Sequence, residues 1–113
     1  MRQPLHRKKI SKRQEKKTAN DIGGRVTPAS GAGKWQKGDV RAVDIRVECK
    51  TTEKASYNLK RETLVKIEVE AHEDEIPVLA LEFIDPNYTM STEFYVVSKA
   101  WFLELLKAYR ERG

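Results

Sequence analysis

The sequence predicts an α/β domain, in which helices are interleaved with a mixed β-sheet. Apolar and charged residues alternate over 43–50, which predicts a strand with one apolar face and one charged face. Residues 76–84, IPVLALEFI, form a continuous apolar run of strand length, as is typical of a buried strand. Helix signals come before, between and after the strands, and this order favours an α/β fold.

The first forty residues are expected to contain a basic arm, one helix and a loop. Residues 1–10 are predicted to be a disordered basic arm, and 11–113 a single domain, since 113 residues suffice for one modest core. Ser11 and Gln14 have the spacing of a capping box, which predicts a polar helix over 12–20. Glycines at 23 and 24 would end it. Residues 24–39, GRVTPASGAGKWQKGD, indicate a loop.

The remaining elements follow from periodicity. Asp39 is expected at the start of a strand that precedes 43–50, with a tight turn or kink between them. Residues 59–75 show a mostly helical spacing, and 91–98 predict a further strand after a turn at 85–87. Ser98 caps a final helix. That helix carries an apolar stripe, expected to be core with a dimer interface as the competing interpretation, formed by Trp101, Phe102, Leu105, Leu106 and Tyr109.

Charge is concentrated near the start of the chain. Residues 1–20 hold eight Lys and Arg against one acid, a net +7, whereas the whole chain has a net charge of +5. A basic segment on a nearly neutral body indicates a polyanionic partner, most often nucleic acid. The alternative is a disordered tail that only aids solubility. No apolar run reaches the ~20 residues that cross a bilayer, and the single cysteine, Cys49, indicates a reducing, intracellular setting.

Several kinds of site are not supported by the sequence. The GAGK segment is not a phosphate-binding P-loop, because Pro28 and Trp35 stand where glycine and a hydroxyl residue are needed. A zinc site is disfavoured because His6, His72 and Cys49 lack metal-ligand spacing. The histidines also lack the context of a catalytic triad, which argues against a serine hydrolase.

Asp39, Glu48 and Lys50 form the strongest candidate set. Positions 48 and 50 of one strand face the same way, so a carboxylate and an ammonium group lie side by side. If Asp39 lies on the adjacent strand, two carboxylates converge beside one lysine, and Mg²⁺ prefers such oxygen ligands. A surface ion pair of little energetic value is the alternative for an isolated E-x-K pattern. The upstream Gly-Asp pair, the basic arm and the Gly-rich basic loop favour a metal-dependent nuclease.

The ordered motifs resemble those of the PD-(D/E)xK nuclease superfamily. Within it, the chain is most similar to the archaeal-type Holliday junction resolvases and their phage relatives, over about residues 11–97. The resemblance is carried by Arg25, ASGAG at 29–33, Asp39, ECKTT at 48–52 and IPVLALEF at 76–83. It implies a restriction-endonuclease-like mixed β-sheet flanked by helices.

The resemblance also implies roles for individual residues. Asp39 and Glu48 would bind Mg²⁺, for which Mn²⁺ can substitute, and the backbone carbonyl of Cys49 would be the third protein ligand. Lys50 matches the catalytic lysine. Gly38 replaces the usual proline before the first acid, at a position that varies in the superfamily.

Further positions match less closely. Ser30 resembles the loop serine that supports junction cleavage, and Arg25 the basic residue that precedes it. Glu15 is the candidate for the first-helix glutamate of the family, although its interval to Arg25 is shorter than expected and its helix is more basic. The residues expected to contact DNA are Arg25, Lys34, Lys37, Lys12, Arg13, Lys16 and Lys60.

The expected function is paired, symmetric cleavage of a four-way DNA junction by a homodimer. The expected partners are therefore branched DNA and a second copy, with no membrane and no small-molecule cofactor, in the cytoplasm, or in the host-cell cytoplasm if a phage encodes the chain. Two alternatives stay open. One is another nuclease of the superfamily that nicks, restricts or repairs DNA, and the other is an inactive DNA-binding member of the fold.

Overall fold

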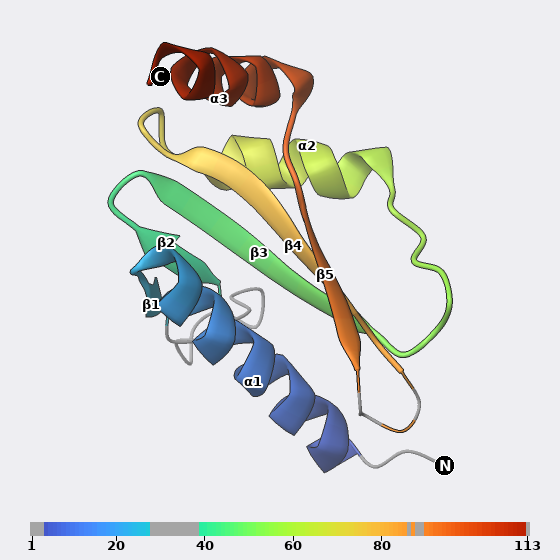
Figure 1. Cartoon of the computed structure of the whole chain (residues 1–113). Helices are drawn as coiled ribbons and strands as arrows, with labels where there is room; N and C mark the ends of the chain where they lie inside the picture. Colours follow the sequence, from blue (N-terminus) through green and yellow to red (C-terminus); the bar gives the residue numbers. More distant parts are fainter. Residues whose placement is uncertain (1–3, 28–38, 86, 88–89, 113) are drawn as a thin grey trace.

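The computed structural model describes residues 4–27, 39–85, 87 and 90–112, which form an α/β fold. A mixed sheet flanked by helices was predicted from the sequence, and this prediction is confirmed. The elements of this described part, in chain order (Figure 1), are α1 Pro4–Ile22, β1 Arg25–Val26, β2 Val40–Ala42, β3 Ile45–Thr52, α2 Arg61–Glu70, β4 Ile76–Ile84, β5 Ser91–Val96 and α3 Lys99–Glu111.

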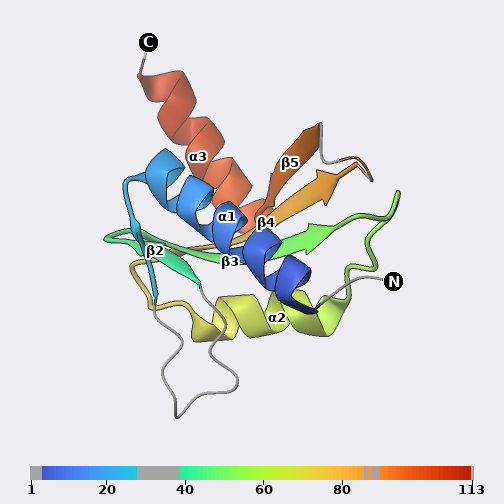
Figure 2. The same ribbon diagram turned by 90° about the horizontal axis from the view of Figure 1, so that it is seen from below.

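The strands form one sheet in the order β1-β2-β3-β4-β5. Only β3 and β4 are parallel, from Ile45 opposite Ile76 to Thr52 opposite Phe83, and the other neighbouring pairs are antiparallel. Parallel strands need a crossover connection, which α2 supplies. Figure 2 shows α1 and α2 on opposite faces of the sheet, so the two faces have different surroundings.

The core lies between the sheet and α1. Val47 and Val40 are fully buried there, and Val78, Ala80 and Ala19 of α1 pack in the same cluster. Side chains alternate along a strand, so Arg46, Glu48 and Lys50 of β3 project from the opposite face, on the side of α2. The charged half of the alternating pattern is therefore the half that carries the candidate chemistry.

Helix α1 is fixed to the sheet by a buried amide. The Gln14 side chain is 2% exposed, and its Nε2 donates to the carbonyls of Lys50 at 3.0 Å and Ala80 at 3.2 Å. The Lys17 ammonium adds ion pairs at 2.9 Å to the buried Glu82 and at 2.7 Å to Glu93. These contacts hold one face of α1 against β3, β4 and β5.

The first helix is longer than the sequence predicted. It begins at Pro4 rather than at 12, so residues 4–10, expected within the disordered arm, belong to α1. Proline is compatible with the first turn of a helix, where no backbone N–H is required. Gly23 ends the helix as expected, with a left-handed φ of 67°, and the Gly24 N–H donates to the Ala19 carbonyl at 2.9 Å.

Three other boundaries differ from the prediction. Val43 was expected in the strand, but it lies in the turn between β2 and β3 and is 88% exposed, because the alternating pattern does not reveal where a hairpin turns. Residues 25–26 were assigned to a loop and form β1. Helix α2 is limited to 61–70, so Leu59 and Ala71 lie outside it.

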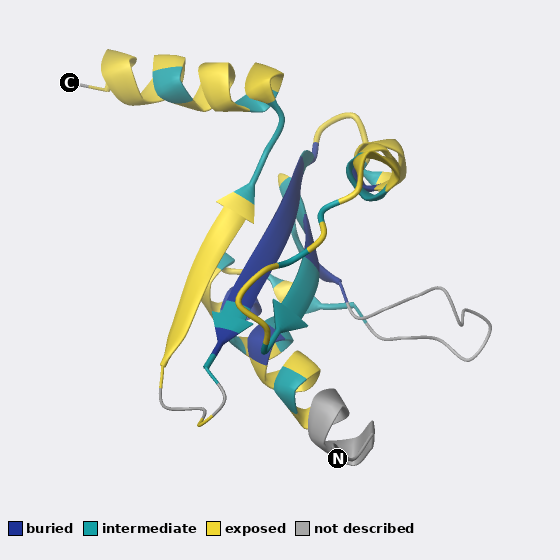
Figure 3. Cartoon of the chain, turned by 90° about the vertical axis from the view of Figure 1, so that its right-hand side faces the viewer, coloured by how far each residue is buried: buried dark blue, intermediate teal, exposed yellow. Residues whose placement is uncertain are grey.

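Helix α3 overturns the core assignment of the C-terminal stripe. Ser98 caps the helix as predicted, with its Oγ accepting from the Trp101 N–H at 3.2 Å. No residue of α3 is buried, however, and the helix is mostly exposed in Figure 3. Periodicity gives the width of an apolar stripe but not whether the same chain covers it. Among the described residues, no helix has the length and apolar character needed to cross a bilayer.

Replacing Gln14 with leucine should destabilise the fold by about 2–4 kcal/mol, because two carbonyls beneath α1 would lose their donor. Urea denaturation at neutral pH measures this change in the free energy of unfolding. Lys16→Gln, on the exposed side of the same helix, is the control and should change it by less than about 0.5 kcal/mol. Equal denaturation midpoints for wild type and Gln14→Leu would contradict the assigned role.

Candidate functional site

The register of the β2–β3 hairpin brings two carboxylates together. Val40 lies opposite Val47, so Asp39, one residue before β2, comes opposite Glu48. Both residues are largely buried, Asp39 at 7% and Glu48 at 8% exposure. The expectation that Asp39 stands at the start of the preceding strand therefore agrees with the structure.

This pair lies where one edge of β3 becomes open. Strand β2 pairs only with residues 45–47 of β3, and no described strand continues along that edge beyond Val47. The other edge of β3 is paired with β4 along its whole length.

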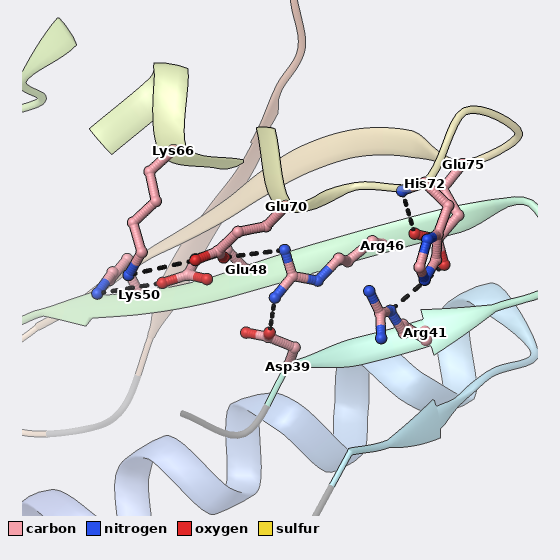
Figure 4. A network of polar contacts seen from close by, with 9 residues as sticks. All are labelled: Asp39, Arg41, Arg46, Glu48, Lys50, Lys66, Glu70, His72 and Glu75. Carbon is pink, nitrogen blue, oxygen red and sulfur yellow. Dashed lines mark hydrogen bonds and ion pairs between the residues drawn. The ribbon is translucent and has the colours of Figure 1, made fainter. Parts of the chain in front are cut away.

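Lys50 completes the expected group. Its Nζ lies 3.5 Å from Oε2 of Glu48, and Figure 4 shows both side chains on the same side of β3. The Lys50 side chain is 23% exposed, so the ammonium group remains accessible to solvent or ligand. The side-by-side placement predicted from the E-x-K spacing is present.

An arginine that the sequence analysis did not single out stands between Asp39 and α2. One nitrogen of the Arg46 guanidinium is in close contact with Oδ2 of Asp39, and the other donates to Oε1 of Glu70 at 3.0 Å (Figure 4). Lys66, one turn earlier on α2, lies 3.7 Å from Glu70. Arg46 therefore links a candidate metal ligand to the crossover helix.

The electrostatics of Asp39 reflect crowding of like charges. Burial raises the pKa of Asp39, the nearby charge of Glu48 raises it further, and Arg46 lowers it, giving a pKa of about 6. Its Oδ1 is buried and has no hydrogen-bond partner within the described part of the chain. A carboxylate with an unsatisfied buried oxygen and a like-charged neighbour is a favourable place for a cation.

Glu15 lies near this pair, although it comes from α1. Burial raises the pKa of Glu15, and the charge of Asp39 raises it further, while Lys12 lowers it. Burial likewise raises the pKa of the Cys49 thiol, to about 12, with further increases from the charges of Glu15, Asp39 and Glu48. The Cys49 thiol therefore stays protonated at neutral pH.

Asp39, Glu48 and Cys49 could supply some of the oxygen ligands that a magnesium ion needs. Asp39 and Glu48 supply two oxygen ligands, and the Cys49 carbonyl belongs to the strand residue next to Glu48. Within the described residues, no group of three His, Cys, Asp or Glu side chains could hold a metal ion. Mg²⁺ is commonly bound by one or two carboxylates and completed by water and substrate phosphate, so two suffice.

A second ion pair supports the hairpin beside the site. Arg41 Nε lies 3.3 Å from Oε2 of Glu75, and Oε1 of Glu75 accepts from the His72 N–H at 2.9 Å (Figure 4). The connection before β4 is thereby tied to β2. This pair involves neither Asp39 nor Glu48, and we assign it a structural role.

The residues expected to bind DNA lie partly on β1, α1 and the start of α2, and partly outside the described residues. Ser30, Lys34 and Lys37 lie outside the described residues. Arg25 on β1 and Lys60 at the start of α2 are exposed and lie on different elements. The remaining three expected residues are exposed along α1, and these are Lys12, Arg13 and Lys16.

The sequence analysis missed Arg46 and Glu70. A signal for Arg46 was present, because it occupies the same face of the alternating strand as Glu48 and Lys50. No comparable signal identified Glu70, whose contact with Arg46 depends on how α2 crosses the sheet.

Comparisons of the chain with protein-family models, with curated proteins and with solved structures find no significant match.

Replacing Asp39 with asparagine should remove part of the change in the free energy of unfolding with pH, when unfolding is measured in EDTA. The pKa of Asp39 is about 6 in the folded chain against an ordinary 3.8, so the folded state holds a proton that the unfolded state releases. The free energy of unfolding should therefore fall as the pH rises from about 4 to about 6. After solvent screening, we expect this contribution to be about 1–2 kcal/mol, and Asp39→Asn should lack it.

The matched control is Asp44→Asn, which removes an exposed carboxylate in the hairpin turn. It should retain the slope of the wild type when urea denaturation is followed across this pH range. An Asp39→Asn protein whose slope equals that of the wild type would contradict the raised pKa.

Proposed function

We propose that the chain is a Mg²⁺-dependent endonuclease that cuts four-way DNA junctions. The observation that carries the chemistry is the register that sets Asp39 opposite Glu48 at the open edge of β3, with Lys50 beside them. The substrate class rests on the resemblance of the ordered motifs to archaeal-type resolvases. The symmetric paired cuts of such an enzyme require two copies of the site.

Each residue of the site has a definite task in this proposal. Asp39 and Glu48 hold the ion together with the Cys49 carbonyl. When bound, Mg²⁺ lowers the pKa of a coordinated water and neutralises charge on the scissile phosphate. The Lys50 ammonium, 3.5 Å from Glu48, orients the attacking water or stabilises charge that develops on the phosphate. The candidate first-helix carboxylate is Glu15, whose pKa is raised by burial and by the charge of Asp39.

Arg46 explains how two carboxylates coexist before an ion binds. Its contact with Asp39 offsets part of the repulsion from Glu48, and its second bond to Glu70 fixes the guanidinium in place. The side chain thus holds the Asp39 carboxylate in place beside β3. We assign Arg46 a positioning role rather than direct contact with the reacting phosphate.

The exposed side of α1 supplies a surface for the DNA backbone. Lys9, Lys12, Arg13 and Lys16 recur at helical spacing and are exposed, whereas Gln14 on the opposite side is buried. Glu15 is partly buried on the side nearer the sheet. These cations lie on the α1 side of the sheet and Glu48 projects on the α2 side, so in this proposal the DNA contacts α1 and reaches the carboxylate pair around the edge of the sheet.

The first test is cleavage of an end-labelled four-way junction in Mg²⁺ and in EDTA, beside a linear duplex with the same arms. Asp39→Asn and Glu48→Gln should each lower the cleavage rate at least about 100-fold, because each removes a ligand for the ion. Junction binding, measured separately, should persist because neither change removes a cation. Asp44→Asn should cut at the wild-type rate.

Cleavage by either pure site variant at the wild-type rate would eliminate the proposed site. Equal cutting of junction and duplex would keep the metal site and assign the chain to the broader nuclease class. Binding of the junction without any Mg²⁺-dependent cutting by the wild type would favour the inactive DNA-binding alternative.

Neutralising α1 should weaken DNA binding without changing the fold. The triple variant Lys12→Gln, Arg13→Gln, Lys16→Gln removes up to three phosphate contacts, and each neutralised phosphate contributes about 0.9 to the slope of log K against log salt. We therefore expect the slope for a junction to decrease by about 2–3, whereas Lys54→Gln, an exposed lysine after β3, should not change it. Fluorescence anisotropy over a series of salt concentrations measures this slope. An unchanged slope in the triple variant would show that the DNA does not bind along α1.

A further inference from the structure

Lys66 of α2 is a cation beside the candidate site to which the proposed function gives no task. The cations of α1 lie on one side of the sheet, whereas Glu48 and Lys50 project from β3 on the other side, toward α2. A DNA strand that reaches Glu48 therefore needs a cationic contact on the α2 side as well. Lys50 is one such group, and Lys66 is placed to be another.

The way α2 packs on the sheet determines the position of Lys66. Ile67 is 4% exposed and is the buried residue of α2, so its direction defines the side of the helix that faces the sheet. Glu70 borders β3, since it accepts a bond from Arg46. Residues four apart on a helix share a face, so Lys66 lies on the same border. Figure 4 shows its side chain extending from α2 toward β3, on the side that carries Glu48 and Lys50.

The ion pair that holds Lys66 is weak. Its Nζ lies 3.7 Å from Oε2 of Glu70, and 51% of the Lys66 side chain is exposed. Exposed pairs at this helical spacing contribute little to stability, and a lysine that precedes its glutamate is the less favourable order. The ammonium group can therefore leave Glu70 for a phosphate at small energetic cost.

Release of Lys66 would not leave Glu70 without a partner. Oε1 of Glu70 accepts from Arg46 at 3.0 Å, and the Arg46 side chain is only 12% exposed. This bond is shorter and better shielded from water than the pair with Lys66. Of the two cations on Glu70, Arg46 is thus the fixed one and Lys66 the one that is free to move.

The charges on this side of β3 balance one another before an ion binds. The ion pairs there join three carboxylates to three cations, and a bound Mg²⁺ would add two positive charges, which favours a phosphate as the next ligand. The two lysines are the more exposed cations, at 23% for Lys50 and 51% for Lys66. The six residues are Asp39, Glu48 and Glu70, with Arg46, Lys50 and Lys66.

We propose that Lys66 is a second phosphate-binding cation of the site, which leaves Glu70 to contact the DNA backbone next to the phosphate that is cut. This inference rests on the proposed function, because the phosphate in question adjoins the one held by Mg²⁺ and Lys50. Lys66 contacts the DNA on the α2 side of the sheet, while the cations of α1 contact it on the other side. Its role is to bind and orient the strand, and it makes no contact with the ion.

Junction binding in the absence of cleavage tests the contact. EDTA prevents metal-dependent cutting and removes Mg²⁺ as a competing counterion. Each neutralised phosphate contributes about 0.9 to the slope of log K against log salt, so Lys66→Gln should lower the slope by about 0.9. Lys66→Arg keeps the charge and should keep the wild-type slope. The control is Lys107→Gln, an exposed lysine of α3, which should not change the slope.

Single-turnover cleavage in Mg²⁺ at saturating protein is the second measurement, since weaker binding then no longer limits the rate. Lys66→Gln should cut the junction at least about 10-fold more slowly, because the strand is less well positioned. Lys66→Arg should restore most of the rate, and Lys107→Gln should match the wild type. Urea denaturation midpoints should be the same for all of these variants, because the 3.7 Å pair contributes little to the fold.

A Lys66→Gln protein that keeps the wild-type slope would overturn the inference, whatever its cleavage rate. A slower rate that Lys66→Arg does not restore would also overturn it, since the positive charge would not be the cause. Cutting that is lost in Asp39→Asn but unchanged in Lys66→Gln would keep the metal site and reject the role of Lys66. If the wild type cuts nothing in Mg²⁺, the proposed function fails, and the slope in EDTA still decides whether Lys66 contacts DNA.

Discussion

The parallel pairing of β3 with β4 is the constraint on which the rest of the structure depends. It requires a crossover, and that crossover places α2 on the face that carries Arg46, Glu48 and Lys50. It also occupies one edge of β3 along its whole length, and on the other edge no described strand pairs with β3 beyond Val47. The candidate site therefore lies at the free edge of a strand whose opposite edge is rigidly held.

At this edge of β3, two neighbouring carboxylates make an unfavourable electrostatic contribution to the stability of the fold. Asp39 and Glu48 repel each other in a partly dry environment, and the single guanidinium of Arg46 offsets only part of that repulsion. Structural ion pairs usually balance their charges, as Arg41 and Glu75 do nearby. The raised pKa of Asp39 and its buried Oδ1 without a hydrogen-bond partner in the described part of the chain are the features that favour a binding site here.

The sequence predicted much of the fold because its strands and helices show clear periodicity. Alternation in β3 placed Glu48 and Lys50 on one face, and Asp39 was expected at the start of the preceding strand. What could not be predicted depends on long-range packing. The bond from Arg46 to Glu70 joins two elements across the crossover, and the exposure of α3 depends on what the chain leaves uncovered. The start of α1 was missed because no capping residue marks it.

The amide of Gln14 has a consequence for the order in which the chain folds. Its two acceptors lie 36 and 66 residues further along, at Lys50 and Ala80, so both strands must be paired before α1 can dock. Contacts of such separation form late, since the intervening chain must first be ordered. Helix α1 therefore docks only after the two later strands have paired, and the β3–β4 surface beneath it stays uncovered until then.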